Sequence, residues 1–503
     1  MFSRREVLKA SAALAGSAAF TGAEARLRAG ADRLCYAPAI DVLRGFFEGK
    51  LSPPEVLDAQ IRQIEAYNPK VNCITRTHFD EARKQAEQSQ KRYKAGNPRP
   101  LEGVTVAVKD EYAVKGWVTT MGSRLLEHAP PDPADSPVIE RLRAAGAIFH
   151  IQTTVPEFYV WMTTATPLWG VTRNPWNLAF TPGGSSGGSG AALAAGFTTL
   201  ALGSDMGGSI RIPSSQCGLY GFKPPFGRVP TSEVPYETQG PMARSFDDLN
   251  LLTQAMVGPH PAVHSSLRPR LNFPVSYAPV TGWKLAFYNG AGISAMEPAV
   301  RSAMDQAQEK FRKLGATVEA VDLGFNAQDM SAFIAGLFST SMGGLATEAM
   351  KAPEKLAAYT RFMLESLNGK TGPEALVAAD ALLDRYHNAV QKQVFGKGFD
   401  AIVMPTLATP LVPAAHGLEP AKDTVSIDGE NVHGLGFAFT WPWNLLGRYP
   451  VVAAPAGLGP ESMPIGLQII TNTFDDLKAF QLAGAYAGVA QPLFTGDAFP
   501  KFV

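Results

Sequence analysis

The sequence predicts an α/β protein built on a large mixed sheet that helices cover on both faces. Stretches with the helical spacing of apolar residues alternate along the chain with short β-branched apolar runs, and this alternation is typical of helices packed against a sheet. Of the 503 residues, 46% are hydrophobic and 18% are charged, which suits a large core. The length would allow two or three domains, but we see no internal repeat and no linker-like stretch that would mark a boundary.

The first elements are expected between residues 37 and 202. Residues 37–90 have a mainly helical pattern, and Ser52-Pro-Pro-Glu55 is a typical helix start. Gly146 and Gly196 follow predicted helices, since glycine readily adopts the left-handed conformation of a helix end. Along this stretch we expect strands at 104–108, 147–152 and 198–202, and helices at 136–145 and 189–195.

The second half repeats the alternation. A helix at 297–314 ends at Gly315 between two apolar runs, and residues 327–393 are mainly helical in pattern. The remaining elements that we expect are strands at 284–288, 317–321, 401–404, 451–454 and 466–470, and a last helix at 473–487.

Two glycine-dense turns carry several serines: Thr-Pro-Gly-Gly-Ser-Ser-Gly-Gly-Ser-Gly at 181–190 and Gly-Ser-Asp-Met-Gly-Gly-Ser-Ile-Arg at 203–211. Glycine lets backbone N–H groups approach a ligand closely, and a hydroxyl beside such donors suits acyl transfer. A flexible linker is the alternative, but apolar segments flank both turns. Neither turn fits a phosphate-binding loop, because no lysine lies between Lys115 and Lys223, or a dinucleotide-binding fingerprint.

These turns resemble the core of the amidase signature family of serine hydrolases, and segments 104–110, 400–406 and 464–470 extend the resemblance along the chain. The resemblance implies one α/β/α domain over residues 36–503, around a twisted sheet of about ten or more strands. It also implies that Ser209 is the nucleophile, Ser185 a bridging serine that a cis peptide bond often precedes, and Lys109 the base. The oxyanion donors would be the backbone N–H groups of Met206, Gly207, Gly208 and Ser209.

The chemistry of these residues is consistent with that assignment. A serine hydroxyl is a weak nucleophile until a base takes its proton. Lysine is normally protonated at neutral pH, but burial disfavours its charged form, and Lys109 follows an apolar run that is expected to be buried. A neutral Lys109 could then accept a proton from Ser185, which accepts one from Ser209.

Neighbouring residues are expected to support the site. Asp205 and Arg211 flank Ser209 and would form an ion pair that fixes its loop, although two solvated charges are the alternative. Ser186 could hydrogen-bond near the site, whereas Cys217 is expected to fill the core rather than to react. The eight histidines are scattered, and Pro261 breaks the one closely spaced pair, His260 and His264. We therefore expect no metal and no organic cofactor.

The N-terminus predicts export. Ser3-Arg-Arg-Glu-Val-Leu-Lys9 carries a twin arginine, a weakly apolar stretch follows at 10–20, and Ala23-Glu-Ala25 resembles a cleavage site. Residues 1–25 are thus predicted to be a twin-arginine (Tat) signal peptide that engages the Tat machinery and directs the protein to the periplasm or outside the cell. A basic amphipathic helix is the alternative. The stretch is too short for a stable membrane span, and 45 basic residues balance 45 acidic ones, so no nucleic-acid partner is expected.

The substrate is less defined by the sequence. Aromatic segments at 157–162 and 437–444 would form the pocket mouth and favour a bulky apolar substrate, such as an aryl amide, a peptide amide or a carbamate. Glu111 stands where asparagine is common in the family, and Trp169 where tyrosine or phenylalanine is common; both could reshape the cavity. Three functions remain: an exported amide hydrolase, the glutaminase-type subunit of a tRNA amidotransferase, and a non-catalytic binding protein on the same scaffold.

Overall fold

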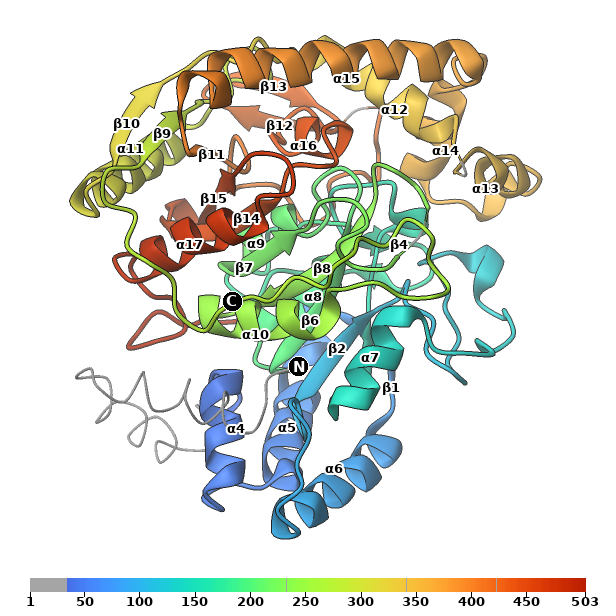
Figure 1. Cartoon of the computed structure of the whole chain (residues 1–503). Coiled ribbons are helices and arrows are strands. Elements are labelled where there is room, and N and C mark those ends of the chain that lie inside the picture. Colours follow the sequence, from blue (N-terminus) through green and yellow to red (C-terminus); the bar gives the residue numbers. More distant parts are fainter. Residues whose placement is uncertain (1–33, 232, 341, 422) are drawn as a thin grey trace.

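An eleven-stranded mixed sheet runs through the molecule and carries helices on both faces (Figure 1). The computed structural model describes residues 34–503 except 232, 341 and 422; the predicted signal peptide at 1–25 lies outside the described residues. The sheet order is β1-β3-β2-β6-β8-β7-β14-β15-β11-β9-β10. Its strands are β1 (Ile74–Thr77), β2 (Thr105–Lys109), β3 (Ile148–Thr153), β6 (Leu200–Asp205), β7 (Tyr220–Lys223), β8 (Thr238–Ala243), β9 (Lys284–Phe287), β10 (Thr317–Ala320), β11 (Ala401–Pro405), β14 (Val451–Leu458) and β15 (Pro464–Ile470).

The sheet combines parallel and antiparallel regions. Strand β2 pairs in parallel with β3 and β6, and β9 pairs in parallel with β10 and β11, while the strands between these groups are antiparallel. Two small antiparallel pairs lie outside the sheet: β4 (Ala165–Thr166) with β5 (Gly170–Val171), and β12 (Thr424–Ile427) with β13 (Glu430–His433). The parallel β3-β2-β6 group is the part that positions the candidate site.

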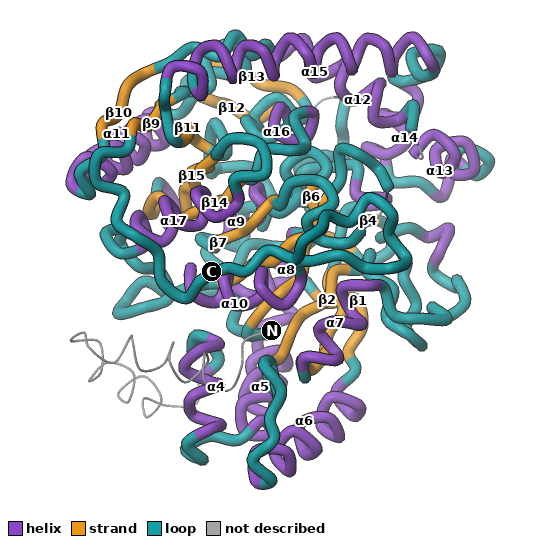
Figure 2. Tube along the Cα trace, viewed as in Figure 1, coloured by secondary structure: helices purple, strands orange, loops and turns teal. Residues whose placement is uncertain are grey.

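The helices cover the faces and both ends of the sheet. Figure 2 shows α4 to α6 gathered near β1, and α12 to α15 at the opposite end of the molecule. They are α4 (Ala39–Phe47), α5 (Pro53–Val71), α6 (Phe79–Lys94), α7 (Pro137–Ala145), α8 (Gly187–Ala194), α9 (Arg211–Cys217), α10 (Phe246–Met256), α11 (Pro298–Lys313), α12 (Met330–Phe338), α13 (Met342–Ala349), α14 (Ala358–Ser366), α15 (Pro373–Gln393), α16 (Pro442–Leu445) and α17 (Asp476–Ala487).

The buried strands send alternate side chains into two separate cores. In β2, Val106 and Val108 pack into the core under α7, α10 and α17, whereas Ala107 packs on the opposite face with α8. Strand β6 does the same with Leu200 and Leu202 on one face and Ala201 on the other. The period of two along a strand explains this division. Ala107 and Ala201 thereby pack against the small residues of α8.

The expected elements are largely present, with ends that move by a few residues. The Ser52 start signal is a capping box, in which the Ser52 N–H donates to Glu55 Oε2 at 2.7 Å. Helix α8 begins at Gly187 rather than at residue 189, and β14 continues to Leu458. The sequence analysis did not expect β1, β7, β8, α9 or α10.

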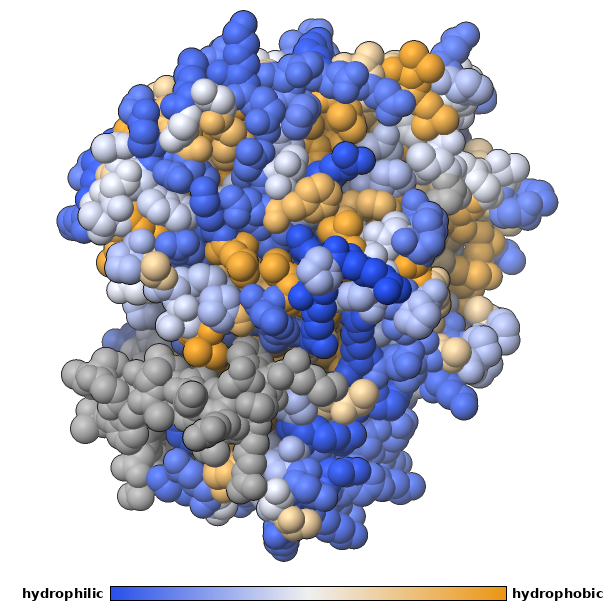
Figure 3. Space-filling model, in the orientation of Figure 1, coloured by the Kyte–Doolittle hydropathy of each residue, from blue (hydrophilic) through white to orange (hydrophobic). Residues whose placement is uncertain are grey.

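The surface of the described residues is mainly polar, with a few exposed apolar side chains (Figure 3). Among the described residues, no single helix is long and apolar enough to span a membrane, although α12 and α13 reach that composition when the two bent helices are taken together. The face in Figure 3 is mainly hydrophilic, with smaller hydrophobic areas between. Val377 on α15 is an exposed large apolar side chain, at 69%.

Candidate active site

The candidate site lies at the carboxyl ends of β2 and β6. Lys109 is the last residue of β2, and Ser204 and Asp205 are the last two of β6. The two strands are parallel neighbours, so their carboxyl ends meet at one edge of the sheet, where open α/β sheets place their ligands. The first glycine-dense turn leads into α8 and the second follows β6 directly. The fold therefore brings both turns to the buried lysine.

Lys109 is fully buried and makes three polar contacts. Its Nζ lies 2.8 Å from Ser185 Oγ, 2.7 Å from Ser204 Oγ and 2.8 Å from Glu111 Oε2. The ring of Tyr159 covers the amine at 4.9 Å. Lys109 is buried, as predicted. The contact with the Glu111 carboxylate was not predicted, because the sequence analysis expected Glu111 only to reshape the cavity. Three oxygen partners match the three donors of an ammonium group.

Ser185 reaches the lysine from the turn before α8. The Gly184–Ser185 peptide bond is cis, as the resemblance implied. Gly184 packs so tightly that a Cβ there would lie 2.9 Å from the carbonyl oxygen of Trp161, which explains why the chain needs glycine at this position. The turn is thereby pressed against the segment that forms one wall of the neighbouring pocket.

Ser209 faces the pocket and is 9% exposed. Among the described residues, its hydroxyl makes no hydrogen bond, so the Lys109–Ser185 contact does not extend to Ser209 in this structure. Hydrogen bonds of this kind are often long without substrate and tighten in the complex. Ser186 connects the first glycine-dense turn to the second turn and to the end of β6. Its N–H donates to the Ser209 carbonyl at 3.2 Å, and its Oγ accepts from the Ser204 N–H at 3.2 Å.

The expected oxyanion donors need one correction. The Gly208 N–H donates to Asp205 Oδ1 at 2.9 Å and is therefore not free for a substrate oxygen. Within the described chain, the N–H groups of Met206, Gly207 and Ser209 have no such acceptor. Gly208 has a φ of +130°, and a Cβ there would lie 2.2 Å from Thr440 Oγ1. The Asp205 carboxylate thus binds the Gly208 N–H within the turn. The N–H groups of Met206, Gly207 and Ser209 remain as the candidate oxyanion donors.

Asp205 and Arg211 form a fully buried ion pair beneath the Ser209 turn, not two solvated charges. Arg211 Nη2 donates to Asp205 Oδ1 and Nε to Oδ2, both at 2.9 Å. Asn444 and Gln468 complete the shell with contacts of 2.6 Å to Arg211. Burial alone would raise the pKa of the Asp205 carboxyl, but Arg211 and Asn444 hold it below its ordinary value. The pair fixes both ends of the turn that carries Ser209.

Cys217 is unlike a reactive thiol. It is fully buried on α9, and burial raises its pKa well above the ordinary value. A thiol that stays protonated is a poor nucleophile, so its place is in the core, as expected. Across the described residues, no group of three His, Cys, Asp or Glu side chains could hold a metal ion.

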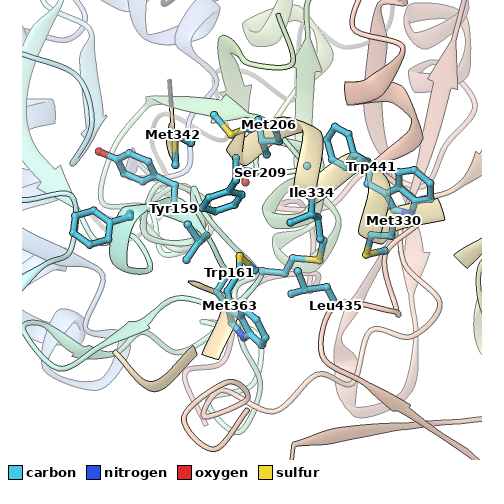
Figure 4. Close-up of a pocket in the computed structure, with 17 residues that line it drawn as sticks. Tyr159, Trp161, Met206, Ser209, Met330, Ile334, Met342, Met363, Leu435 and Trp441 are labelled. Carbon is cyan, nitrogen blue, oxygen red and sulfur yellow. The ribbon is translucent and has the colours of Figure 1, made fainter. Parts of the chain in front are cut away.

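An apolar pocket that is partly open to solvent adjoins Ser209. In Figure 4 the Ser209 side chain lies among the apolar side chains that line it. The wall at 158–162 confirms one of the two aromatic segments predicted for the pocket, whereas only Trp441 of the second segment lines it. Glu111 and Trp169 are not among the lining residues. The lining is Phe158, Tyr159, Val160, Trp161, Met162, Met206, Gly207, Ser209, Met330, Phe333, Ile334, Leu337, Phe338, Met342, Met363, Leu435 and Trp441.

A comparison with protein families decides the wider class. The profile described as Amidase matches residues 55–479. The chain belongs to the amidase family. This amidase is 32% identical over 473 residues to a glutamyl-tRNA(Gln) amidotransferase subunit from Synechococcus sp. (strain CC9605), an alignment that covers 88% of this chain and 94% of that protein.

Solved structures of family members share the fold of this amidase. A bacterial aryl acylamidase of the amidase signature family matches with a TM-score of 0.81 and 29% identity, covering 90% of this chain and 96% of that one. A 6-aminohexanoate cyclic dimer hydrolase matches with a TM-score of 0.79 and 26% identity, covering 93% and 99%. These similarities support an amide-hydrolysing enzyme with a large mixed sheet.

The structure adds residues that the sequence analysis did not name. Ser204 bridges Lys109 and Glu111, since its Oγ donates to Glu111 Oε2 at 2.5 Å. No spacing in the sequence marks Ser204, which lies at the end of β6 and shares the second glycine-dense segment with Ser209. The pocket residues of α12, Met330 and Ile334 among them, lie more than a hundred positions from Ser209 and could not be assigned from local pattern.

Proposed function

We propose that this amidase hydrolyses carboxylic amides that carry a bulky apolar group, through an acyl-enzyme on Ser209. The observation that carries the proposal is the placement of Ser209 at an apolar pocket, on a turn whose Met206, Gly207 and Ser209 N–H groups have no acceptor within the described chain. Ser186 is hydrogen-bonded to the Ser209 carbonyl, and its neighbour Ser185 is hydrogen-bonded to Lys109. A nucleophile, a positioned base and oxyanion donors are the parts that acyl transfer requires.

In the proposed reaction a proton is relayed from Ser209 to Lys109 and later returned to the leaving nitrogen. Ser209 Oγ attacks the amide carbon and forms a C–O bond, while its proton passes to Ser185 and the proton of Ser185 passes to a neutral Lys109 amine. The N–H groups of Met206, Gly207 and Ser209 would stabilise the oxyanion. The C–N bond then breaks, and the proton returns along the same path to the leaving nitrogen. Water next cleaves the ester by the same steps and releases the carboxylic acid.

The pocket supports an apolar substrate class. Among its described lining residues none is charged, and five are methionines, whose flexible side chains adapt to irregular apolar ligands. Aryl amides, peptide amides with an apolar end and carbamates fit this description. The aryl acylamidase with the same fold acts, by its name, on substrates of the first class.

A role within an amidotransferase is the second candidate, because a protein of that kind is among the relatives. Its amide donor would be glutamine, which carries an ammonium and a carboxylate group. Binding two charges requires polar or charged partners. The described pocket lining has no charged side chain, and its polar side-chain groups are the hydroxyls of Ser209 and Tyr159 and the indole N–H groups of Trp161 and Trp441. We therefore favour hydrolysis of apolar amides by the single chain.

We further propose export through the Tat route, on the twin arginine at positions 4 and 5 and the stretch that follows it. A protein exported in this way folds before export, and the three described cysteines are all free and buried, so its fold requires no disulfide.

The test is amine release from a panel of small aliphatic amides, aryl acylamides, peptide amides and aryl carbamates, with a Ser209→Ala variant assayed beside the wild type. We expect serine-dependent release from the aryl and apolar members and little from acetamide-sized ones. Release from small polar amides alone would reject the apolar substrate class. Silence across the panel would instead favour a non-catalytic binding protein.

A further inference from the structure

Glu111 places a carboxylate beside Lys109, the proposed base. The proton transfer between Ser185 and Lys109 does not itself require this carboxylate. Glu111 Oε2 lies 2.8 Å from Lys109 Nζ. The Ser204 hydroxyl contacts both groups, at 2.7 Å from Nζ and 2.5 Å from Oε2. The Lys109 side chain is fully buried and that of Glu111 is 11% exposed. Water screens such a pair only weakly, so its electrostatic interaction is strong.

Burial and pairing act on the lysine in opposite directions. Removing an ammonium from water disfavours its charged form, whereas a carboxylate within hydrogen-bond distance favours it. The three oxygens around Nζ can satisfy all three ammonium donors. Lys109 must be neutral before it can accept a proton from Ser185. Glu111 therefore contacts the very group that accepts the proton in the proposed reaction.

Other titratable groups approach this cluster but engage different partners. The Tyr112 hydroxyl donates to the Gly203 carbonyl at 2.7 Å, and the Tyr159 hydroxyl donates to the Asp110 carbonyl at 3.1 Å. Burial first, then the charges of Glu111, Asp110 and Glu237, raise the pKa of Tyr159 well above its ordinary value. Tyr159 therefore stays neutral over the working range of the enzyme.

Two more carboxylates lie near and are accounted for. Asp110 accepts from the Thr120 N–H and from Gln152 Nε2, each at 2.9 Å, and burial raises its pKa to about 6. Asp205 is paired with Arg211. Only the Glu111 carboxylate makes a direct contact with Lys109 among the described residues.

Resting on the proposed function, we propose that Glu111 is a positioning residue that aims the Lys109 amine at Ser185 and sets the pH range of amide cleavage. When Ser185 gives its proton to Lys109, the ammonium that forms is stabilised by Glu111 and Ser204. The proton then returns from Lys109 through Ser185 to the leaving nitrogen. Glu111 therefore neither gains nor loses a proton during the reaction.

The test compares the pH dependence of kcat/KM for wild type and Glu111→Gln, from about pH 5 to about pH 10, a range that brackets both limbs of such profiles. Glutamine keeps the shape and removes the charge, so neutral Lys109 becomes accessible at lower pH. We expect the rising limb to move to lower pH by about one to three pH units, the usual effect of a neighbouring opposite charge. We also expect kcat to fall while KM stays within about twofold, since Glu111 does not line the pocket.

Glu102→Gln is a matched control. Glu102 is a fully buried carboxylate that contacts a cation, Arg99 Nε at 2.6 Å, and a serine, Ser89 Oγ at 2.6 Å, before the opposite end of β2. Its removal should lower stability and leave the rising limb in place. Glu111→Asp, which keeps the charge, should restore the limb towards the wild-type position.

The outcomes separate the two proposals. An inactive wild type with every amide tested would reject the proposed function. An active wild type whose rising limb is unchanged in Glu111→Gln would reject the role of Glu111, whatever the change in kcat. Should Glu111→Gln not fold by circular dichroism, Glu111→Asn carries the same test, because it also removes the charge.

Discussion

At the scale of single residues, the Asp205–Arg211 pair is the strongest constraint on the Ser209 turn. Both side chains are fully buried, and Asp205 also accepts hydrogen bonds from the N–H groups of Gly208 and Ile210. Breaking a buried pair leaves an uncompensated charge in the interior, which is far more costly than losing a surface contact. Breaking the Asp205–Arg211 pair should therefore also disrupt the structure of the turn that carries Ser209.

We predict that Asp205→Asn lowers the free energy of unfolding by about 3–5 kcal/mol, because Arg211 is left buried without its counter-ion. Denaturant unfolding followed by circular dichroism measures this. Glu309→Gln is the control, since Glu309 pairs with Arg312 on the exposed face of α11 with side chains 64% and 43% exposed. The control should cost less than about 1 kcal/mol. Equal losses in the two variants would contradict this account.

Lys223 gives a second prediction at this scale. Burial first, then Arg211, lowers its pKa to about 7. Between about pH 7 and its ordinary value the unfolded chain holds a proton that the folded protein does not, so stability should rise with pH. Lys223→Met removes this titration. Its stability relative to wild type should be highest near pH 6 and should decline by about 1.4 kcal/mol per pH unit above pH 7. A difference that does not vary with pH would refute the prediction.

At the scale of elements, helix α12 forms one wall of the pocket beside Ser209. Met330 and Ile334 lie four residues apart on α12 and both line the pocket, as Figure 4 shows, because this spacing places side chains on one helix face. We predict that Ile334→Asp lowers kcat/KM for aryl acylamides by about tenfold or more, since the ligand would meet a charge that needs water.

The control for that change lies on the neighbouring helix α15. Val377 is 69% exposed, so Val377→Asp should leave kcat/KM within about twofold, as expected for an exposed position away from the pocket. Steady-state assays of both variants with one aryl acylamide and one small amide decide the matter. A loss that is the same for both substrates would point to damage of the fold instead of the pocket.

Local sequence pattern predicted most elements next to the site and missed those defined only by their neighbours. The Ser52 capping signal and Gly146 mark ends that are fixed by a few adjacent residues, and both are present. Strand β7 is Tyr-Gly-Phe-Lys, four residues with a glycine and a lysine, and β8 contains a proline and a glycine. Neither has strand-like composition, so their pairing with β14 and β6 determines their structure.

The candidate site divides in the same way. The two glycine-dense turns pointed to Ser185, Ser209, Asp205 and Arg211, because glycine and serine are concentrated there and the turns carry the resemblance to the amidase signature family. The contact of Glu111 with Lys109 joins two residues close in the sequence, yet its geometry depends on Ser204 on another strand. The occupied Gly208 N–H likewise depends on a turn whose shape no local pattern specifies.

At the scale of the whole molecule, one chain carries all the proposed parts of the reaction. We therefore predict that the purified protein works without a partner chain, and that glutamine is turned over at least about a hundredfold more slowly than an aryl acylamide, the scale on which a site rejects a ligand whose charges it leaves unpaired. Ammonia and amine release are measured side by side. Comparable rates with glutamine would support the amidotransferase alternative.

The proposed export also concerns the whole chain. Replacing the twin arginine by Arg4→Lys and Arg5→Lys keeps the charge, and we predict that it holds the protein in the cytoplasmic fraction of a Tat-competent bacterium while the wild type reaches the periplasm. Lys9→Arg, in the same segment, is the control and should not change the distribution. Periplasmic delivery of the double variant would contradict the Tat proposal.

The central claim is an acyl-enzyme on Ser209. The most direct measurement is the mass of the intact protein, quenched in acid within the first turnovers of an aryl acylamide and then digested to locate the modification. We predict a mass increase equal to the acyl group, on the peptide that contains Ser209, and none in Ser209→Ala, whose turnover falls by roughly three powers of ten or more. An acyl group on another residue, or undiminished hydrolysis by Ser209→Ala, would contradict the claim.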